Sequence, residues 1–313
     1  MAQFILRTDN PEIPPPWDFP NVTIQSFRLP ATLSNLQDLC DKLLNIGDPE
    51  DRGFEYVAFA GFVDMEIVTY PKMSFAESPY SSWGFASQQE FYFRFFVWKF
   101  VYVSGLLFPE PLPEFCIPFI FVDNSWSMIS GRNVIGFPKA MAEFSPPAVL
   151  GVNPFKVAIS TPVLATHLPT TKLQMMPIVK IDPWPQGNPA VPNGVWPWLD
   201  LGVELGDPIL NDYLELLQAA IPDAFAIVEL KQFRDAASLT DACYQAVVST
   251  RFSPSNIGQP QALPPVKVTV NSYASLDIPG SLGLPPNPIE PLLQYAVSMD
   301  LSTSSAQNLF VNT

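Results

Sequence analysis

Short apolar runs separated by prolines make up most of this chain of 313 residues. Its 36 prolines are spread along the whole length, and proline interrupts helices and is excluded from central strands. We therefore expect many short elements, with strands outnumbering helices. The predicted strands are rich in β-branched and aromatic residues, and they cover residues 55–63, 65–70, 91–103, 115–123, 156–161, 225–233 and 266–278.

Helical spacing of apolar residues appears in three segments, 34–47, 206–222 and 240–249. The first places four leucines and Cys40 on one face, with Ser34 as the candidate N-cap. The second begins with a proline directly after an aspartate cap, the preferred start of a helix. Because the strands do not alternate with helices, the pattern argues against a doubly wound fold. It favours an α+β or mainly β architecture, in which a barrel is one option.

The most apolar stretch, residues 91–108, approaches the length of a membrane span. Arg94 and Lys99 lie inside it, and its aromatic residues are typical of strands, so we expect a long buried strand. The N-terminus lacks the basic start and long apolar core of a signal peptide, which predicts a cytoplasmic protein. Residues 182–198, rich in proline and tryptophan, are expected to form an ordered surface loop or lid.

Charged residues make up only 15% of the chain, where about 25% is usual for soluble domains. Either much of the chain is buried in a core, or its surface is unusually apolar and is shared with other subunits. We therefore expect a homo-oligomer. The net charge of −14 argues against binding to nucleic acid or to anionic membranes, because both require basic patches.

Most common catalytic motifs are absent from the sequence. His167 is the only histidine, and the three cysteines have no metal-ligand spacing. There is no nucleophile elbow, phosphate-binding glycine loop, dinucleotide fingerprint or zinc motif. Hydrolase, NTPase and dehydrogenase chemistries therefore lack their residues, and we expect neither a metal nor another cofactor.

One lysine stands in unusual surroundings. Lys139 follows Pro138, and Phe137 and Met141 flank it. Removing a lysine amine from water favours its neutral, nucleophilic form, which is the form that condenses with a ketone to an imine. The alternative is that the side chain extends its amine to solvent, as lysines beside apolar residues often do.

The segment around this lysine resembles the acetoacetate decarboxylase superfamily. The family has an aromatic-x-Asp segment, then Gly-Arg-Glu, then an aromatic-Pro-Lys-Lys sequence whose first lysine forms the Schiff base. The matching residues run without gaps and read Phe121-Val122-Asp123-Asn124, Gly131-Arg132-Asn133 and Gly136-Phe137-Pro138-Lys139-Ala140.

The resemblance implies one α+β domain over residues 1–313, built around a closed, cone-shaped β-barrel with surrounding strands and a few peripheral helices. Weaker similarity extends it over roughly residues 17–285 and leaves 286–313 as an extra tail. It identifies Lys139 as the imine-forming residue and Glu66 as the candidate base. A second pocket residue is Gln88 by direct count or Glu90 after a small shift.

Four further residues are candidates for binding the substrate: Phe137, Met141, Arg132 and Arg28. Arg28 aligns with a Tyr-Arg pair of the family, which favours a structural role. The family's second lysine is replaced by Ala140, and its Gly-Arg-Glu glutamate by Asn133. The stretch that should carry an arginine for the substrate carboxylate, residues 18–27, has none.

These residues predict a lyase that forms a Schiff base through Lys139 with a keto acid or a polyketide-like ketone of secondary metabolism. Decarboxylation, aldol chemistry and dehydration all use the same imine. The missing arginine and second lysine disfavour simple acetoacetate decarboxylation, and the many aromatics suggest a larger, more apolar substrate. The alternatives are a pocket protein or cyclase that binds its ligand without an imine, and a structural protein, which the apolar composition alone would favour.

Overall fold

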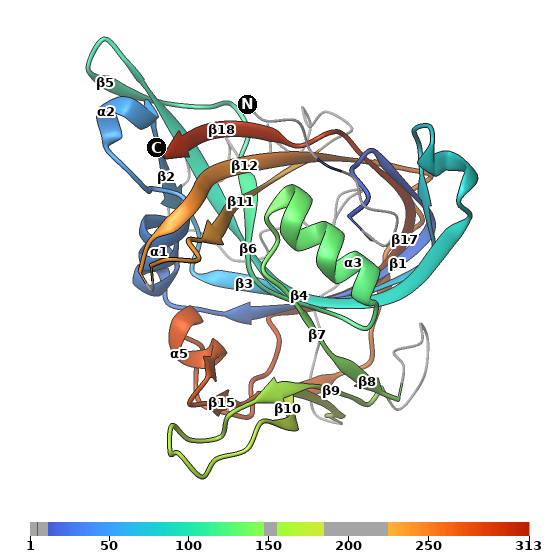
Figure 1. The fold of residues 1–313 in the computed structure, drawn as a ribbon. Helices are drawn as coiled ribbons and strands as arrows, with labels where there is room; N and C mark the ends of the chain where they lie inside the picture. Colours follow the sequence, from blue (N-terminus) through green and yellow to red (C-terminus); the bar gives the residue numbers. More distant parts are fainter. Residues whose placement is uncertain (1–4, 6–11, 147–154, 185–224, 239, 313) are drawn as a thin grey trace.

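The structure is a computed structural model that describes residue 5 and residues 12–146, 155–184, 225–238 and 240–312. Within this part of the chain, strands form one sheet of 12, one of four and one of two. Few helices accompany them, so the architecture is α+β and mostly strand, as the pattern predicts. Figure 1 shows α3 in the middle of the view with strands of the large sheet around it.

The large sheet contains β1 (Trp17–Pro30), β2 (Phe54–Ala58), β3 (Phe62–Phe75), β4 (Phe85–Val103), β5 (Leu106–Pro109), β6 (Glu114–Val122), β7 (Lys139–Met141), β11 (Phe225–Arg234), β12 (Ala242–Ser255), β13 (Gln261–Ala262), β17 (Leu293–Thr303) and β18 (Gln307–Asn312). The smaller sheets contain β8 (Glu143–Ser145), β9 (Val157–Val163), β10 (Gln174–Pro183) and β14 (Val266–Val270), and β15 (Ser272–Tyr273) with β16 (Leu276–Asp277). The described helices are α1 (Leu33–Leu43), α2 (Pro49–Arg52), α3 (Ser125–Ser130) and α5 (Ile278–Leu282), with a 3₁₀ turn η1 (Tyr80–Ser82) and a π-helical turn η2 (Gly131–Ile135).

The large sheet returns on itself. Its strands follow the order β17-β1-β3-β4-β6-β11-β12, and β12 pairs again with β17 through Phe252↔Thr303 and the next three residue pairs. Most neighbours are antiparallel, while β11 lies parallel to β6. The hydrogen-bonded strand order is therefore a closed ring.

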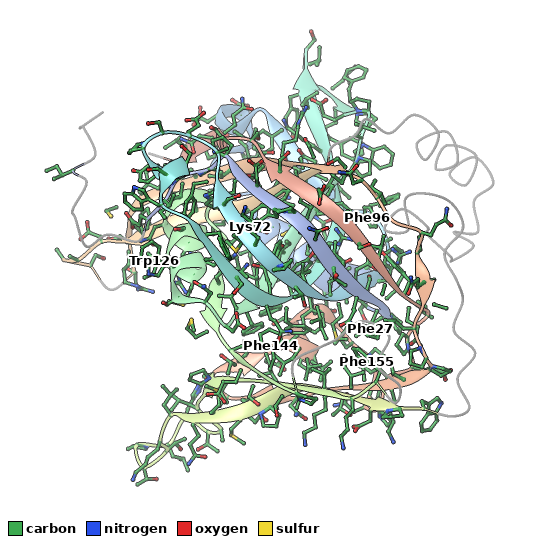
Figure 2. All side chains as sticks on the ribbon, turned by 90° about the vertical axis from the view of Figure 1, so that its right-hand side faces the viewer. Phe27, Lys72, Phe96, Trp126, Phe144 and Phe155 are labelled. Atoms are coloured by element: carbon green, nitrogen blue, oxygen red, sulfur yellow. The ribbon has the colours of Figure 1, made fainter. Side chains whose placement is uncertain are left out.

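Strands of the ring are buried on both faces. Along β4, Phe91, Phe93 and Phe95 belong to one apolar cluster, whereas Tyr92 and Phe96 belong to the other. Successive side chains of a strand point to opposite faces, so this alternation assigns one cluster to each face. The four-stranded sheet covers the first cluster, where the rings of Phe27 and Phe155 lie 5.7 Å apart (Figure 2). The second cluster surrounds the pocket described below.

The three helix predictions have different outcomes. The helix expected at 34–47 exists as α1, but it starts at Leu33 after Thr32 rather than after Ser34. The prediction of a helix at 240–249 is wrong, because these residues lie largely in β12. There they pair with β11 on one side and β18 on the other, and these cross-strand contacts override the weak helical spacing. The third predicted helix, 206–222, and most of the loop at 182–198 lie outside the described residues.

The strand predictions identify most of the ring but miss its closure. Residues 55–63 split between β2 and β3, and 266–278 form only β14 and two short strands before α5. The expected strand at 115–123 is followed directly by helix α3, which the helical spacing of the sequence does not predict. Residues 286–313, expected to be an extra tail, supply β17 and β18, and β17 pairs along its length with β1.

Residues 91–103 of the apolar stretch belong to β4, as expected, but only 91–97 are buried. The chain then turns at 104–105 and continues into β5, whose residues are exposed, so the expected single buried strand is two strands. None of the helices in the described ranges is long and apolar enough to cross a membrane.

Candidate active site

A largely apolar pocket lies on the side of the ring that carries the second cluster. It is lined by residues of β1, β3, β4, β6, α3, β11, β12 and β17, so most strands of the ring contribute to it. Its walls include Trp17, Phe19, Ile117, Phe225 and Phe252. Lys139 lies in this lining, together with a small group of polar side chains.

Lys139 is held in the pocket by the connection from β6 to β7. Strand β7 lies parallel to β6, with Lys139 beside Ile120. The chain between them turns through α3 and η2, and the lysine stem packs directly on Gly131. A Cβ atom at this glycine would lie 2.6 Å from Lys139 Cδ, which is shorter than any normal contact. Lys139 is only 5% exposed, so its amine is sequestered from bulk solvent.

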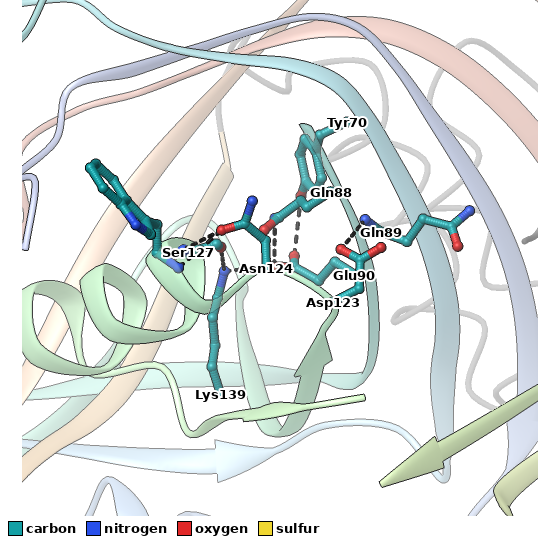
Figure 3. A network of polar contacts seen from close by, with 9 residues as sticks. Tyr70, Gln88, Gln89, Glu90, Asp123, Asn124, Ser127 and Lys139 are labelled. Carbon is teal, nitrogen blue, oxygen red and sulfur yellow. Dashed lines mark hydrogen bonds and ion pairs between the residues drawn. The ribbon is translucent and has the colours of Figure 1, made fainter. Parts of the chain in front are cut away.

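The amine of Lys139 has two polar partners, Glu90 and Ser127 (Figure 3). Nζ donates to Glu90 Oε2 at 2.6 Å and to Ser127 Oγ at 2.9 Å. Ser127 lies in the first turn of α3, which Asn124 caps by accepting hydrogen bonds from the backbone N–H groups of Trp126 and Ser127. The cap thus fixes the position of the hydroxyl beside the lysine.

Glu90 is the centre of a polar group on β4. Tyr70 donates to Glu90 Oε1, and Gln88 Nε2 donates to Glu90 Oε2, each at 3.2 Å (Figure 3). Burial, followed by the charge of Glu90, raises the pKa of Tyr70 well above its usual range, so the tyrosine remains a donor. Gln88 and Glu90 lie two residues apart on the same face, and both line the pocket. The sequence left these two residues as alternatives, and the structure brings both beside Lys139.

Glu66 lies in a separate buried cluster. It accepts hydrogen bonds from Tyr92 at 2.5 Å and from Arg94 at 2.7 Å, and it is fully buried. Burial raises the pKa of its carboxyl group, and the charge of Arg94 counteracts this. Tyr92 and Arg94 are among the pocket-lining residues, but Glu66 is not.

Of the four expected substrate-binding residues, one lines the pocket and three lie outside its lining. Phe137 lines the pocket, whereas Met141 does not. Arg28 is buried in an ion pair with Asp64, at 2.7 Å, and its guanidinium lies 4.0 Å from the ring centre of Phe62. Arg132 is exposed and donates to the backbone oxygen of Lys139 at 2.9 Å, so it supports the lysine from outside the pocket.

Sequence reasoning missed several residues that line the pocket or contact the amine, namely Ser127, Tyr70, Tyr92, Arg94 and Trp126. One signal for part of this set is the alternation "QEFYFR" at 89–94, in which polar and aromatic residues take turns. In a strand buried on both faces, such alternation indicates a polar inner face.

The described residues contain no group of three or more His, Cys, Asp or Glu side chains suited to hold a metal ion. His167 is exposed and is not among the residues that line the pocket.

Comparison with known proteins supports the fold. No protein-family model and no curated protein matches the sequence. Among solved structures, acetoacetate decarboxylase from Legionella pneumophila is similar with a TM-score of 0.57 and 14% identity, over 99% of this chain and 93% of that one. An acetoacetate decarboxylase-like enzyme from Sphingomonas wittichii RW1 gives 0.56 and 11%, over 98% of both chains. The chain therefore has the acetoacetate decarboxylase fold at very low sequence identity.

A third structural relative is MppR, an enzyme of enduracididine biosynthesis, in its complex with pyruvate. It has a TM-score of 0.51 and 13% identity, over 95% of this chain and 91% of that one.

Proposed function

We propose that the protein is a lyase that forms a Schiff base between Lys139 and a ketone or keto acid. The observation that carries the proposal is the position of Lys139 Nζ. It is buried at the wall of an apolar pocket and lies 2.6 Å from a carboxylate, Glu90, and 2.9 Å from a hydroxyl, Ser127.

The first step requires a neutral amine. The Lys139 ammonium group lies 2.6 Å from the Glu90 carboxylate, so Glu90 is placed to accept its proton when the ketone has bound. The neutral amine then attacks the carbonyl carbon of the substrate and forms a C–N bond. The carbonyl oxygen takes up protons and leaves as water, and the nitrogen retains one proton in the resulting iminium ion.

The iminium ion then accepts an electron pair from a neighbouring bond. The pair comes from a C–C bond when carbon dioxide leaves, or from a C–H bond when a base removes the proton. Glu90 is the base that lies on the pocket wall beside Lys139, whereas Glu66 is bound by Tyr92 and Arg94. Reprotonation of the enamine and hydrolysis of the imine restore the lysine.

The structural relatives support this class of reaction. The Legionella and Sphingomonas proteins are a decarboxylase and a decarboxylase-like enzyme. MppR has also been described in complex with the condensation product of pyruvate and imidazole 4-carboxaldehyde. We extend the likeness to a closed, cone-shaped barrel that shields the imine from water, the geometry that the ring of strands would provide.

Borohydride trapping tests the proposal. The protein is incubated with acetoacetate, pyruvate and the aromatic ketone benzylacetone, reduced with sodium borohydride, and examined by mass spectrometry after proteolysis. We expect a reduced adduct on the peptide that contains Lys139 with at least one ketone. Replacing the exposed Lys180 by arginine should leave the adduct unchanged, and Lys139→Arg should abolish it, because arginine forms no such imine.

The ion pair with Glu90 also favours one alternative, in which Lys139 stays charged and binds ligands without a covalent bond. The same variants separate the two functions. If folded Lys139→Arg protein keeps its turnover, or if no ketone labels Lys139, the imine mechanism is wrong and the non-covalent function remains.

A further inference from the structure

The charges that face the pocket are already balanced within the protein. Of the pocket-lining residues that the structure describes, Lys139 and Arg94 are the cations. Lys139 is paired with Glu90 at 2.6 Å. Arg94 is paired with Glu66 at 2.7 Å, and its Nε lies 3.9 Å from Asp64, which also pairs with Arg28. These buried groups, three cations and three anions, balance in net charge. Arg94 Nε has no hydrogen-bond partner among the described residues, but it lies 3.9 Å from the Asp64 carboxylate, which balances its charge.

The residues outside the described ranges offer little more positive charge. The residues outside the described ranges contain one lysine, arginine or histidine, which is Arg7. Residues 147–154 and 185–224 contain none, whichever way they lie. A buried carboxylate without a cation is strongly disfavoured relative to water. The pocket is therefore better suited to an uncharged ligand.

Gln88 supplies the second observation. Its side chain is 5% exposed and lines the pocket. Nε2 is assigned by its bond to Glu90 Oε2, since a carboxylate accepts a hydrogen bond from the amide nitrogen and not from the amide oxygen. This leaves Gln88 Oε1 buried and without a hydrogen-bond partner among the described residues. A buried oxygen without a hydrogen-bond partner favours a ligand that carries a hydrogen-bond donor.

The position of this acceptor relative to the lysine limits where the ligand's donor can be. Gln88 Nε2 and Lys139 Nζ both bind the same oxygen, Glu90 Oε2. These two bonds are 3.2 Å and 2.6 Å long, so Nε2 and Nζ can lie no farther apart than their sum, and a ligand bonded to Nζ brings the atoms next to its carbonyl carbon close to the Gln88 amide.

We propose that the substrate is an uncharged, largely apolar ketone with a hydroxyl group close to the carbonyl, as in a β-hydroxy ketone, and that Gln88 Oε1 accepts the hydrogen bond from that hydroxyl. This inference names the substrate class for the proposed function and rests on it. It makes Gln88 a specificity-determining residue and disfavours β-keto acids as ligands.

Three matched probes test the proposal: benzylacetone, its β-hydroxy derivative, and the β-keto acid made by adding a carboxyl group to the terminal methyl of benzylacetone. Dissociation constants are measured by calorimetry with the wild-type protein and with Lys139→Gln, which cannot form an imine. We expect the β-hydroxy ketone to bind about three- to tenfold more tightly than benzylacetone, the range of one hydrogen bond. The keto acid should bind at least about tenfold more weakly than benzylacetone.

Two variants test whether Gln88 causes the preference for the β-hydroxy ketone over benzylacetone. Gln88→Met removes the acceptor with little change in side-chain length, and it should reduce the hydroxyl preference to about one. Tyr70→Phe is the matched control, because it also removes one hydrogen bond to Glu90 but leaves Gln88 Oε1 in place. It should keep the preference, and thermal unfolding verifies that both variants are folded.

The possible outcomes separate this proposal from the imine mechanism. A hydroxyl preference in Lys139→Gln that Gln88→Met removes supports the ligand class even if no borohydride adduct forms. Equal binding of the two neutral ketones overturns the role of Gln88, including the case in which a water molecule satisfies Oε1. Keto-acid binding as tight as that of benzylacetone overturns the inference of an uncharged substrate, even if Lys139 is trapped as an imine.

Discussion

The position of the Lys139 amine depends on a residue with no side chain. Gly131 lies against the lysine stem, and a methyl group there would collide with both Cδ and Cε. The backbone at Gly131 is ordinary right-handed helix, with φ −61°, so the requirement for glycine is steric and not conformational. The glycine of the Gly131-Arg132-Asn133 motif thus has a physical reason: it makes room for the amine.

Gly131→Ala should therefore impair the chemistry more than the fold. Overpacking of this kind costs about 1–3 kcal/mol of stability, while displacement of a reacting group by about 1 Å reduces rates about a hundredfold. Borohydride trapping rates and thermal unfolding measure the two effects separately. Gly61→Ala is a suitable control, because its added methyl would lie 3.2 Å from a backbone oxygen, that of Ala31. Normal trapping by folded Gly131→Ala would contradict the steric argument.

Another residue-scale feature is a buried carboxyl group outside the pocket lining. Glu229 on β11 is 3% exposed, and its Oε1 accepts the backbone N–H of Ile117 at 2.6 Å. Burial raises the pKa of Glu229 well above its usual range, and the bond from Ile117 only partly opposes this. Ionisation of this group in the folded protein is therefore unfavourable.

Glu229→Gln should stabilise the protein relative to wild type increasingly as pH rises. The folded pKa lies above the unfolded value of about 4.3, so the wild type loses stability as pH rises from that value through the folded pKa. Glutamine keeps the acceptor for Ile117 and does not ionise. The measurement is the difference in melting temperature between the two proteins, followed from about pH 4, close to the unfolded pKa, to about pH 9. A difference that is constant or shrinks with rising pH would show that Glu229 is not the titrating group.

At the scale of elements, alternation along β4 explains both what sequence reasoning found and what it missed. The aromatic richness of 91–103 predicts a buried strand, and the structure confirms a strand there that is buried over 91–97 and exposed at 102–103. The alternating polar residues Glu90, Tyr92 and Arg94 indicate a polar inner face, but only Glu90 was predicted to lie in a pocket, and Arg94 was noted only as a charge inside an apolar run. Lys139 and the pair Gln88 and Glu90 were predictable because they lie in or near a recognisable motif.

The elements that escaped prediction depend on contacts between distant segments. Helix α3 is six residues long, too short for a periodic signal, and Asn124 at its start is the local sign of it. Residues 240–249 have weak helical spacing, and only pairing with β11 and β18 makes them a strand. Glu66 lies on the expected strand, but its pairing with Arg94 across β3 and β4 cannot be read from either segment alone.

At the scale of the whole molecule, the C-terminal strand β17 completes the ring. It pairs with β1 over most of its length and with β12 near its end, and Met299 and Leu301 line the pocket. Strand β18 has a different role, because it pairs only with β12 at the end of the strand order.

Two truncations should distinguish these strands. Removal of residues 286–313 deletes β17 and exposes the buried edge of β1, so we expect loss of cooperative thermal unfolding and aggregation. Removal of residues 306–313 deletes only β18, and that protein should unfold cooperatively at a lower temperature. Cooperative unfolding of the longer deletion would mean that the ring is stable without its last strand.

The closure of the ring also constrains how the protein is made. β1 leaves the ribosome long before its hydrogen-bonding partner β17, because β1 ends at Pro30 and β17 begins at Leu293. Until then, one edge of β1 has no native neighbour, and pairings between such remote positions form slowly. The nascent chain therefore exposes an unpaired strand edge until β17 has been made, and its yield in cells should depend on chaperones that cover that edge until then.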